Sequence, residues 1–529
     1  MLHRKKWMPI AVTVILVQAI LEGFALFSLA TLNMLPDKYM LVVVLCMALS
    51  LVVTAILLFS GMKKHRMGRA RRARRIIAII LAAVFGVGSV IAASMTQQLK
   101  TSVNEVTDNE GTLSAMVGVY VMADNPAKAI TDAEDYNFGV MENYDTQNTT
   151  AALDTLKLKF GKEAKTTNEA SVTDCAKALY DGTVDALLIN EAYTAALTDF
   201  DEYASFETDT RLLDEIPIYA QDTASDDSSK DGDTAVQSAS SSSEPLPDFN
   251  KLNSEAAEGV SDITTTPFVM YISGSDTRSQ ILDTSRSDVN ILMAVNPKSK
   301  QVLLINTPRD YYVGNPAGGG AKDKLTHCGL YGVDCSIGAL EGLYSTNVEY
   351  YMQINFTGFE KLIDSIGGIT VNAPEDFTAG GYHYNKGENY VNGAQALAFA
   401  RERHSFASGD RQRGKDQMEV IRAVIDKVTS GTTLLTNYTS VLNSLQDMMV
   451  TNVSSDEISD LVKMQLNDGA SWDVKKYSVS GSDAHMMTYS MPSFTAYVMI
   501  PYDDDVSKAS ELLQKVMSGE QITDEEVSD

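Results

Sequence analysis

At 529 residues the chain is long enough for roughly three to four domains. Its composition, with 44% hydrophobic and 21% charged residues, is that of a globular protein that can build sizeable cores. The net charge of −26 argues against general nucleic-acid binding, because an acidic body repels polyphosphate. The charge is unevenly spread, since the first hundred residues hold 13 Lys and Arg against two acids.

Three apolar runs predict three membrane-spanning helices, each near the ~20 residues that cross a bilayer. The runs extend over Met8–Leu32, Tyr39–Ser60 and Ile76–Met95. Basic residues precede the first run and fill the loop at 63–75, so the positive-inside rule places both in the cytoplasm. We therefore expect a multi-pass protein of the cell membrane, with residues 1–98 as its anchor and the remaining bulk extracellular. A cleaved signal peptide does not fit the length of the first run or the two runs that follow.

Glu22, near the middle of the first run, is costly in lipid. We expect it to pack against another helix, with a proton relay as the alternative. Cys328 and Cys335 lie close together in the exported part, where they form either a local disulfide or two free buried thiols. No second pair accompanies them, so their spacing is not a zinc pattern.

Short apolar strands alternate with helical stretches in residues 99–221, which predicts a small extracellular α/β module. The expected strands are 117–122, 136–141 and 184–189, and the expected helices are 149–160 and 172–180. The stretch 176–190 loosely resembles a piece of a periplasmic solute-binding lobe, and we interpret the module as a spacer or a binding unit. Residues 222–266 are rich in Ser and Asp and predict a solvated linker.

Charged residues then cluster around the strands of a second exported unit, predicted over 267–430. Strands are expected over 268–273, 289–295 and 302–306, and two helices near 392–403 and 410–417. The charged residues at their ends are Asp276, Arg286, Asp288, Arg309, Arg401, Arg403 and Arg413. Guanidinium groups offer paired donors to phosphate oxygens, while carboxylates fit the same site only if a cation such as Mg²⁺ joins them to the phosphates.

Several ordered strings in this unit resemble the LytR-CpsA-Psr domain of bacterial cell-wall enzymes. They are Ser285-Arg-Ser-Asp288, Thr307-Pro-Arg-Asp310, Lys324-Leu-Thr-His-Cys-Gly-Leu-Tyr-Gly332, Ile366-Gly-Gly-Ile-Thr-Val371, the stretch Asn392–Arg403, and Gly409-Asp410 with Arg413 and Gln417. The resemblance implies an α/β/α sandwich with a central mixed sheet and a hydrophobic tunnel for a polyprenyl chain. Phe356, Phe359, Leu362 and Ile363 are candidates for the tunnel wall, or are ordinary core residues.

By that resemblance, the protein would be a Mg²⁺-dependent phosphotransferase that attaches an undecaprenyl-pyrophosphate-linked glycopolymer, teichoic-acid-like or capsular, to peptidoglycan outside the membrane. Its partners would be the polyprenyl-pyrophosphate-linked glycopolymer, peptidoglycan and membrane lipid. Asp276 and Asp288 would hold Mg²⁺. Phosphate-binding roles would fall to Arg286, Arg309, Lys324, Arg401, Arg403, Arg413 and Gln417, of which Arg286, Arg309, Arg401 and Arg403 would act in catalysis with the two aspartates.

One departure from the family is Asp416, which stands where a second arginine often follows the residue matching Arg413. It weakens the expected outer rim of the phosphate site, although Lys415 is a candidate replacement.

The alternatives are hydrolysis of the same pyrophosphate lipid, or a non-enzymatic membrane-bound regulator or wall-binding protein. Ser-His-Asp hydrolysis is disfavoured, because none of the four exported histidines accompanies a nucleophile motif. The tail at 431–529 shows no chemical motif, and it either completes the second unit or packs against it.

Overall fold

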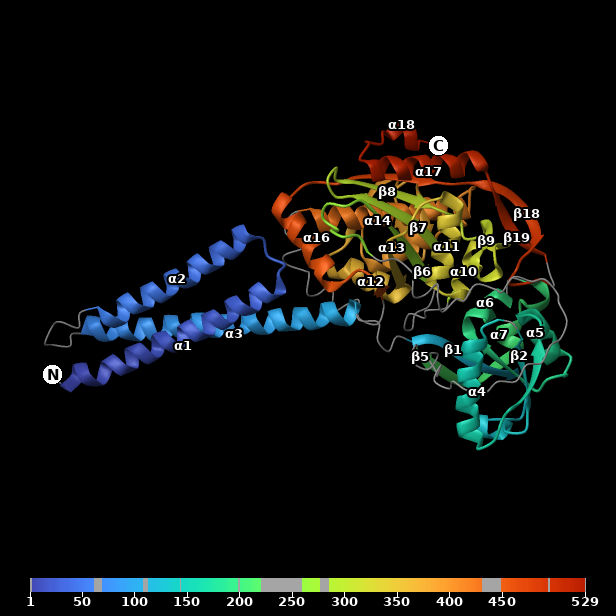
Figure 1. The fold of residues 1–529 in the computed structure, drawn as a ribbon, viewed down its shortest axis with the longest axis horizontal. Helices are drawn as coiled ribbons and strands as arrows, with labels where there is room; N and C mark the ends of the chain where they lie inside the picture. The colour runs from blue at the N-terminus through green and yellow to red at the C-terminus, as the bar shows by residue number, and fades with distance from the viewer. Residues whose placement is uncertain are drawn as a thin grey trace, which may run out of the picture.

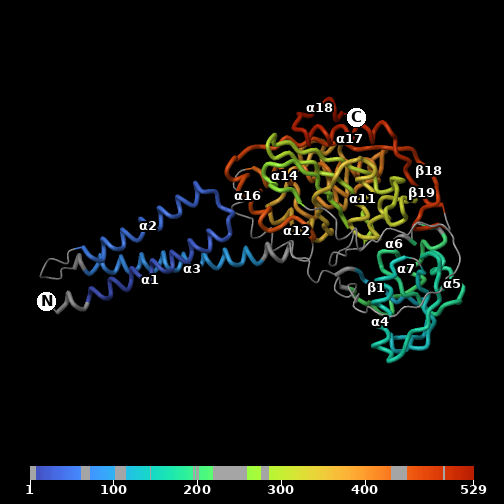
Figure 2. Tube along the Cα trace, viewed as in Figure 1, coloured from blue at the N-terminus to red at the C-terminus, as the bar shows by residue number. Residues whose placement is uncertain are grey.

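The computed structural model describes residues 2–60, 69–107, 113–142, 144–197, 200–219, 259–275, 285–430, 449–492 and 495–528. It contains an elongated bundle of three helices, a small α/β unit that we call the accessory module (residues 113–219), and a larger C-terminal domain (residues 259–528) (Figures 1 and 2). Most of the predicted linker at 222–266 lies outside the described residues.

The three predicted apolar helices are present and are long and apolar enough to cross a membrane. They are α1 (Leu2–Leu32), α2 (Asp37–Phe59) and α3 (Arg69–Thr107). Glu22 is 2% exposed inside the bundle, where its Oε1 accepts hydrogen bonds from Gln18 Nε2 at 2.8 Å and Ser50 Oγ at 2.6 Å. Glu22 thus joins α1 to α2, in agreement with the expected packing role.

The accessory module has a five-stranded sheet in the order β3-β2-β4-β1-β5. Its strands are β1 (Leu113–Met122), β2 (Asn137–Met141), β3 (Lys165–Glu169), β4 (Ala186–Asn190) and β5 (Thr210–Tyr219), and its longer helices are α4 (Thr146–Phe160) and α5 (Val172–Tyr180). β2 is parallel to β3 and β4, while β1 is antiparallel to β4 and β5. All the predicted elements are present, and β3 and β5 add one strand at each edge.

The C-terminal domain is built on a six-stranded mixed sheet in the order β16-β11-β6-β7-β8-β17. The strands are β6 (Phe268–Ser275), β7 (Val289–Asn296), β8 (Gln301–Asn306), β11 (Tyr350–Asn355), β16 (Met449–Thr451) and β17 (Asp473–Ser478). β6 is parallel to β11, and β8 is parallel to β17, with β7 running antiparallel between β6 and β8.

Helices cover both faces of this sheet, as the α/β/α prediction requires. The helices are α10 (Leu325–Cys328), α11 (Val333–Tyr344), α12 (Phe356–Ser365), α13 (Gly393–Arg401), α14 (Asp410–Thr429), α16 (Ser455–Asp468), α17 (Asp503–Ser518) and α18 (Asp524–Val527). Alternate residues of a strand point to opposite faces. Tyr271 and Leu292 accordingly pack with α11 and α17, whereas Ile272 and Ile291 pack with α14 and α16.

Shorter strands form separate pairs around the main sheet. They are β9 (Tyr312–Asn315) with β10 (Ala321–Lys324), β12 (Ile369–Ala373) with β15 (Gly387–Val391), β13 (Phe377–Ala379) with β14 (Tyr382–Tyr384), and β18 (Gly481–Met487) with β19 (Thr495–Pro501). Cys328, the last residue of α10, and Cys335, in the first turn of α11, are both buried free thiols. The second of the two cysteine alternatives is therefore the one the structure shows.

The packed part of the domain extends beyond 267–430 at both ends. Ile263, from the predicted linker, is 2% exposed in the core under β6 and β7. On the other side, β16 and β17 supply the two edge strands of the main sheet. The C-terminal tail therefore completes the domain.

Candidate active site

The candidate site lies at the strand ends on one side of the main sheet, where β6, β8 and β11 end and β7 begins. Asp288 directly precedes β7, and its backbone N–H donates to the carbonyl of Gly274 at 3.1 Å. Arg309 follows β8. Because these ends meet at the same edge of the sheet, residues 21 positions apart in the chain become neighbours.

α13 and α14 bring the remaining arginines to this edge. α13 begins with a capping box, in which Asn392 Oδ1 accepts from the Gln395 backbone N–H and Gln395 Oε1 accepts from that of Asn392, both at 3.0 Å. The helix ends at Arg401. Gly409, with φ of +53°, then turns the chain into α14, a conformation that glycine adopts readily.

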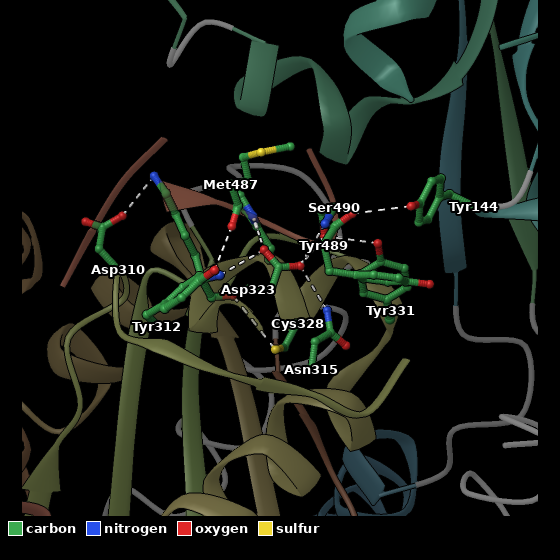
Figure 3. Close-up of polar contacts among 12 residues, drawn as sticks. Tyr144, Asp310, Tyr312, Asn315, Asp323, Cys328, Tyr331, Met487, Tyr489 and Ser490 are labelled. Carbon is green, nitrogen blue, oxygen red and sulfur yellow. Dashed lines mark hydrogen bonds and ion pairs between the residues drawn. The ribbon is translucent and has the colours of Figure 1, made fainter. Parts of the chain in front are cut away.

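Ion pairs join Asp288, Arg309, Asp310 and Lys324 in a row, and a separate ion pair joins Arg413 to Asp410. Arg309 Nη1 donates to Asp288 Oδ1 at 2.8 Å, and Arg309 Nε lies 3.6 Å from Asp310 Oδ2. Lys324, only 4% exposed, places its Nζ 3.1 Å from Asp310 Oδ1 (Figure 3 shows Asp310 and this ion pair). Arg413 Nη2 lies 2.5 Å from Asp410 Oδ1.

The pKa values show that these groups act on one another. Burial alone would raise the pKa of Asp288, but Arg309, Arg286 and Arg413 outweigh it and hold that pKa below its usual value. Burial lowers the pKa of Arg413, partly balanced by Asp410 and Asp288 and reinforced by Arg309 and Arg403. Asp288 is therefore ionised at neutral pH, in surroundings dominated by guanidinium groups.

A mostly apolar cavity of about 90 Å³ adjoins the charged groups. Phe356, Phe359 and Leu397 line it together with the side chains of Arg401 and Gln417. The Arg401 guanidinium lies over the ring of Phe356, 4.4 Å from its centroid. Arg401 and Gln417 thus lie where the charged cluster meets an apolar wall.

The four tunnel candidates divide into two kinds. Phe356 and Phe359 line the cavity, as a tunnel wall would. Ile363 is a fully buried core residue beside α13, and Leu362 packs against Met449 of β16.

The structure brings most of the predicted site residues together. Asp288, Arg286, Arg309, Arg403 and Arg413 interact electrostatically, Lys324 joins them through Asp310, and Arg401 and Gln417 share the cavity. Asp276 lies outside the described residues. Lys415 is placed elsewhere, since it lines a different cavity with Ser478 and Lys508, and Asp416 is 2% exposed.

Sequence reasoning did not assign roles to Asp310 and Asp410, which orient Lys324, Arg309 and Arg413. The sequence could have indicated these ion pairs, because Asp310 directly follows Arg309 and Asp410 stands three residues before Arg413.

The described residues would hold a Mg²⁺ ion only together with other ligands, such as the oxygens of a bound phosphate. No group of three His, Cys, Asp or Glu side chains in the described ranges could hold a metal by itself. Asp288 is ionised and has Oδ1 bound to Arg309. Asp288 could therefore contribute one oxygen to a Mg²⁺ ion, and the predicted second ligand Asp276 lies outside the described residues.

The fold and the site define an α/β/α domain with a cluster of arginines beside an apolar cavity. The model of the LytR_cpsA_psr family matches residues 225–506, more than half of the chain. The protein therefore belongs to the LytR_cpsA_psr family.

Curated relatives support the same assignment. The polyisoprenyl-teichoic acid–peptidoglycan teichoic acid transferase TagU of Bacillus mycoides is 36% identical over 202 residues, covering 38% of this chain and 65% of the relative. The protein of the same name from Enterococcus faecalis is 34% identical over 194 residues, covering 36% and 63%. The chain thus spans somewhat less than two thirds of the length of these relatives.

Solved structures are also similar to part of the chain. The crystal structure of B. subtilis TagV has a TM-score of 0.41 and 26% identity, covering 48% of this chain and 98% of its own. A structure of TagT bound to LI-WTA has a TM-score of 0.39 and 25% identity, covering 49% and 94%.

Proposed function

We propose that this protein is a membrane-anchored phosphotransferase that moves a glycopolymer from a polyprenyl-pyrophosphate carrier to peptidoglycan. The observation that carries the proposal is the junction of the arginine cluster with the apolar cavity at Arg401 and Gln417. A polyprenyl pyrophosphate needs both environments side by side. The relatives named as teichoic acid transferases agree with this reaction class.

The proposed orientation places the C-terminal domain outside the cell. The three long apolar helices would hold it beside the bilayer that contains the carrier lipid. The basic residues at the start of α1 and at 63–75 favour the cytoplasm, which leaves the C-terminal end of α3 on the outer side.

In the reaction, the acceptor hydroxyl oxygen of peptidoglycan attacks the phosphorus that carries the glycopolymer. A new oxygen–phosphorus bond forms as the bond to the bridging oxygen breaks, and polyprenyl phosphate leaves with that oxygen. Arg309, Arg401 and Arg413 neutralise the charge on the two phosphates, which is the main requirement of phosphoryl transfer. A carboxylate that faces the acceptor takes the hydroxyl proton.

Mg²⁺, when bound, would be held by Asp288 and by the predicted second ligand Asp276, and would add positive charge at the pyrophosphate. The remaining roles belong to side chains. Asp310 keeps Lys324 beside Arg309, and Asp410 orients Arg413. The apolar wall at Phe356 excludes water from the lipid end of the site.

The test is a reaction of the purified full-length protein in detergent with a polyprenyl-pyrophosphate-linked oligosaccharide and peptidoglycan fragments. The Arg401→Ala, Arg403→Ala double variant should lower formation of the joined product at least 100-fold, because two phosphate contacts are lost. Lys361→Ala removes an exposed cation from neighbouring α12 and should leave the rate unchanged.

The product pattern separates the alternatives. Transfer requires that polyprenyl phosphate release depends on the acceptor and that the oligosaccharide becomes joined to it. Release at an equal rate without acceptor, with free oligosaccharide phosphate, would assign the protein to pyrophosphate hydrolysis. Absence of release by the folded wild-type protein would leave only the non-enzymatic role.

A further inference from the structure

Three tyrosines meet where the accessory module touches the C-terminal domain (Figure 3). The ring of Tyr144 lies 5.5 Å from that of Tyr489 and 6.4 Å from that of Tyr331, and the last two are 6.0 Å apart. The Tyr144 hydroxyl donates to the carbonyl of Tyr489 at 3.3 Å. All three side chains are half-buried, so each lies partly in contact with solvent where the two units meet.

Next to Tyr144 in the chain, a polar cluster lies at the carboxyl ends of the parallel strands β2 and β4. Asp145 precedes α4, and Asn148 in the first turn of that helix donates from Nδ2 to Asp145 Oδ1 at 2.5 Å. Asn190, the last residue of β4, also forms a side-chain hydrogen bond with Asp145. This end of parallel strands is where α/β folds place their ligands.

Three buried side-chain oxygen atoms in this part of the module have no hydrogen-bond partner in the described part of the chain, and Tyr193, which carries one of them, interacts electrostatically with Asp145. They are Asp145 Oδ2, Asn148 Oδ1 and the hydroxyl oxygen of Tyr193. Tyr193 is 1% exposed and Asn148 is 5% exposed, whereas Asp145 as a residue is only partly buried although its Oδ2 is closed off from solvent. Buried polar atoms are usually paired, so three unpaired oxygen atoms in one region are candidates to accept hydrogen bonds from a ligand.

A nearby buried carboxylate, that of Asp323, has hydrogen-bond partners for both of its oxygens. Asp323, which is 0% exposed in the C-terminal domain, hydrogen-bonds with the side chains of His327, Asn315 and Ser490. It also accepts from the backbone N–H groups of Lys324 and Ser490. Among the described residues, the Asp145 side chain interacts with Asn148 and Asn190, and its Oδ2 has no hydrogen-bond partner.

A ligand group that pairs with these oxygen atoms should be a hydrogen-bond donor with a positive charge. All three orphan atoms can accept a hydrogen bond, and the charged groups that act on Tyr193 are Asp145 and Asp323, both acidic. Burial raises the pKa of Asp145 to about 7, as expected of a carboxylate that lacks a counter-cation. An ammonium group carries three N–H donors and no acceptor, and tyrosine faces attract it.

We propose that Asp145, Asn148 and Tyr193 bind an organic ammonium group at the boundary between the accessory module and the C-terminal domain. The ligand enters past the half-buried rim of Tyr144, Tyr331 and Tyr489. This site is separate from the arginine cluster, so it does not depend on the transferase reaction. The ammonium group belongs either to an amino sugar or to an amino-acid derivative, since both present the same donor set.

The test is calorimetric titration of the full-length protein in detergent with glucosamine and, separately, with alanine methyl ester. Each has a matched N-acetylated control that keeps the shape and removes the charge. At least one ammonium probe should bind, and its acetylated form should bind at least tenfold more weakly. The probe that binds identifies the source of the ammonium group.

Variants connect binding to the cluster. Asp145→Asn should weaken binding of that probe at least tenfold, and Tyr193→Phe, which removes one hydroxyl and keeps the ring, about threefold or more. Asp154→Asn removes an exposed carboxylate from the same helix and should have no effect. The proposal is overturned if neither ammonium probe binds, if an acetylated control binds equally well, or if both site variants retain wild-type affinity.

Discussion

Asp416 lies on α14 between Arg413 and Gln417, and it is 2% exposed. Gln412 Nε2 donates to its Oδ1 at 2.9 Å, and its Oδ2 has no partner among the described residues. Burial raises its pKa to about 7, with Gln412 and Lys476 acting in the opposite direction. Burial of the ionised Asp416 carboxylate therefore lowers the folding stability of the domain.

This cost predicts a stabilising substitution. An unfolded Asp has a pKa near 3.9, so between about pH 4 and pH 7 the folded protein retains a proton that the unfolded chain has lost. Stability contributed by this group is thus present at low pH and lost as pH rises toward 7. Asp416→Asn should raise the melting temperature on the order of 5 °C at pH 8.

The measurement is thermal unfolding by circular dichroism at pH 8 and pH 4. The gain should disappear at pH 4, where Asp416 is protonated in the folded protein. Asp426→Asn, a partly exposed carboxylate ion-paired on the same helix, serves as the comparison and should give no gain at pH 8. An equal gain for Asp416→Asn at both pH values would contradict the raised pKa.

At this scale the sequence predicted residue types better than their partners. Arg309, Arg401 and Arg413 could be chosen because arginines at the ends of strands and helices are unusual in an acidic chain. Asp310 could not be assigned, since only the folded structure brings Lys324 to its carboxylate. The orientation of Asp416 into the core likewise depends on how α14 is rotated, which its neighbours in three dimensions determine.

Among the elements, α14 is held unusually close to the end of β8. A Cβ atom on Gly414 would lie 2.2 Å from Nδ2 of Asn306, the last residue of that strand. Asn306 is 4% exposed and donates from the same nitrogen to Ser478 Oγ at 3.1 Å. Glycine at this position thus sets the distance between Arg413 on the helix and Arg309 after the strand.

Gly414→Ala should therefore displace α14 or break the Asn306 to Ser478 hydrogen bond. Overpacking of this kind costs about 1–3 kcal/mol, partly offset by the ~1 kcal/mol that alanine gains over glycine in a helix. The expected result is a modest loss of stability with a larger loss of affinity for the lipid pyrophosphate, measured by unfolding and by titration. Asn306→Ala should restore much of the affinity in the double variant by making room, and simple addition of the two losses would contradict the steric account.

The elements that the sequence missed are those with the weakest patterns. β3 reads Lys-Thr-Thr-Asn-Glu and β5 contains Pro217, and both are edge strands that need neither alternation nor a full set of donors. β6 and β8 were predictable because both faces of a central strand are buried, which leaves a continuous apolar run. The edge strands β16 and β17 are recognised only by their pairing with strands about a hundred residues or more away.

In the whole molecule, the segment between β18 and β19 connects the C-terminal domain to the accessory module (Figure 1). Met491 of this segment is 1% exposed in the core of the module, together with Leu330. Tyr489 contacts Tyr144, and Ser490 donates to Asp323. One short segment thus packs into the module and is hydrogen-bonded to the residue that precedes Lys324.

Met491→Ala combined with Tyr489→Ala should uncouple the two units. Each large-to-small change in a packed core costs about 2–5 kcal/mol, and here the loss falls on the contact between the units. The wild-type protein should therefore unfold the module and the C-terminal domain together in calorimetry, whereas the double variant should show a separate, earlier transition for the module. Met486→Ala, an exposed methionine on β18, should keep the single transition. A single transition in the double variant would mean that other contacts hold the module against the C-terminal domain. The segment between β18 and β19, with its hydrogen bond to Asp323, would then not be the main connection between the two units.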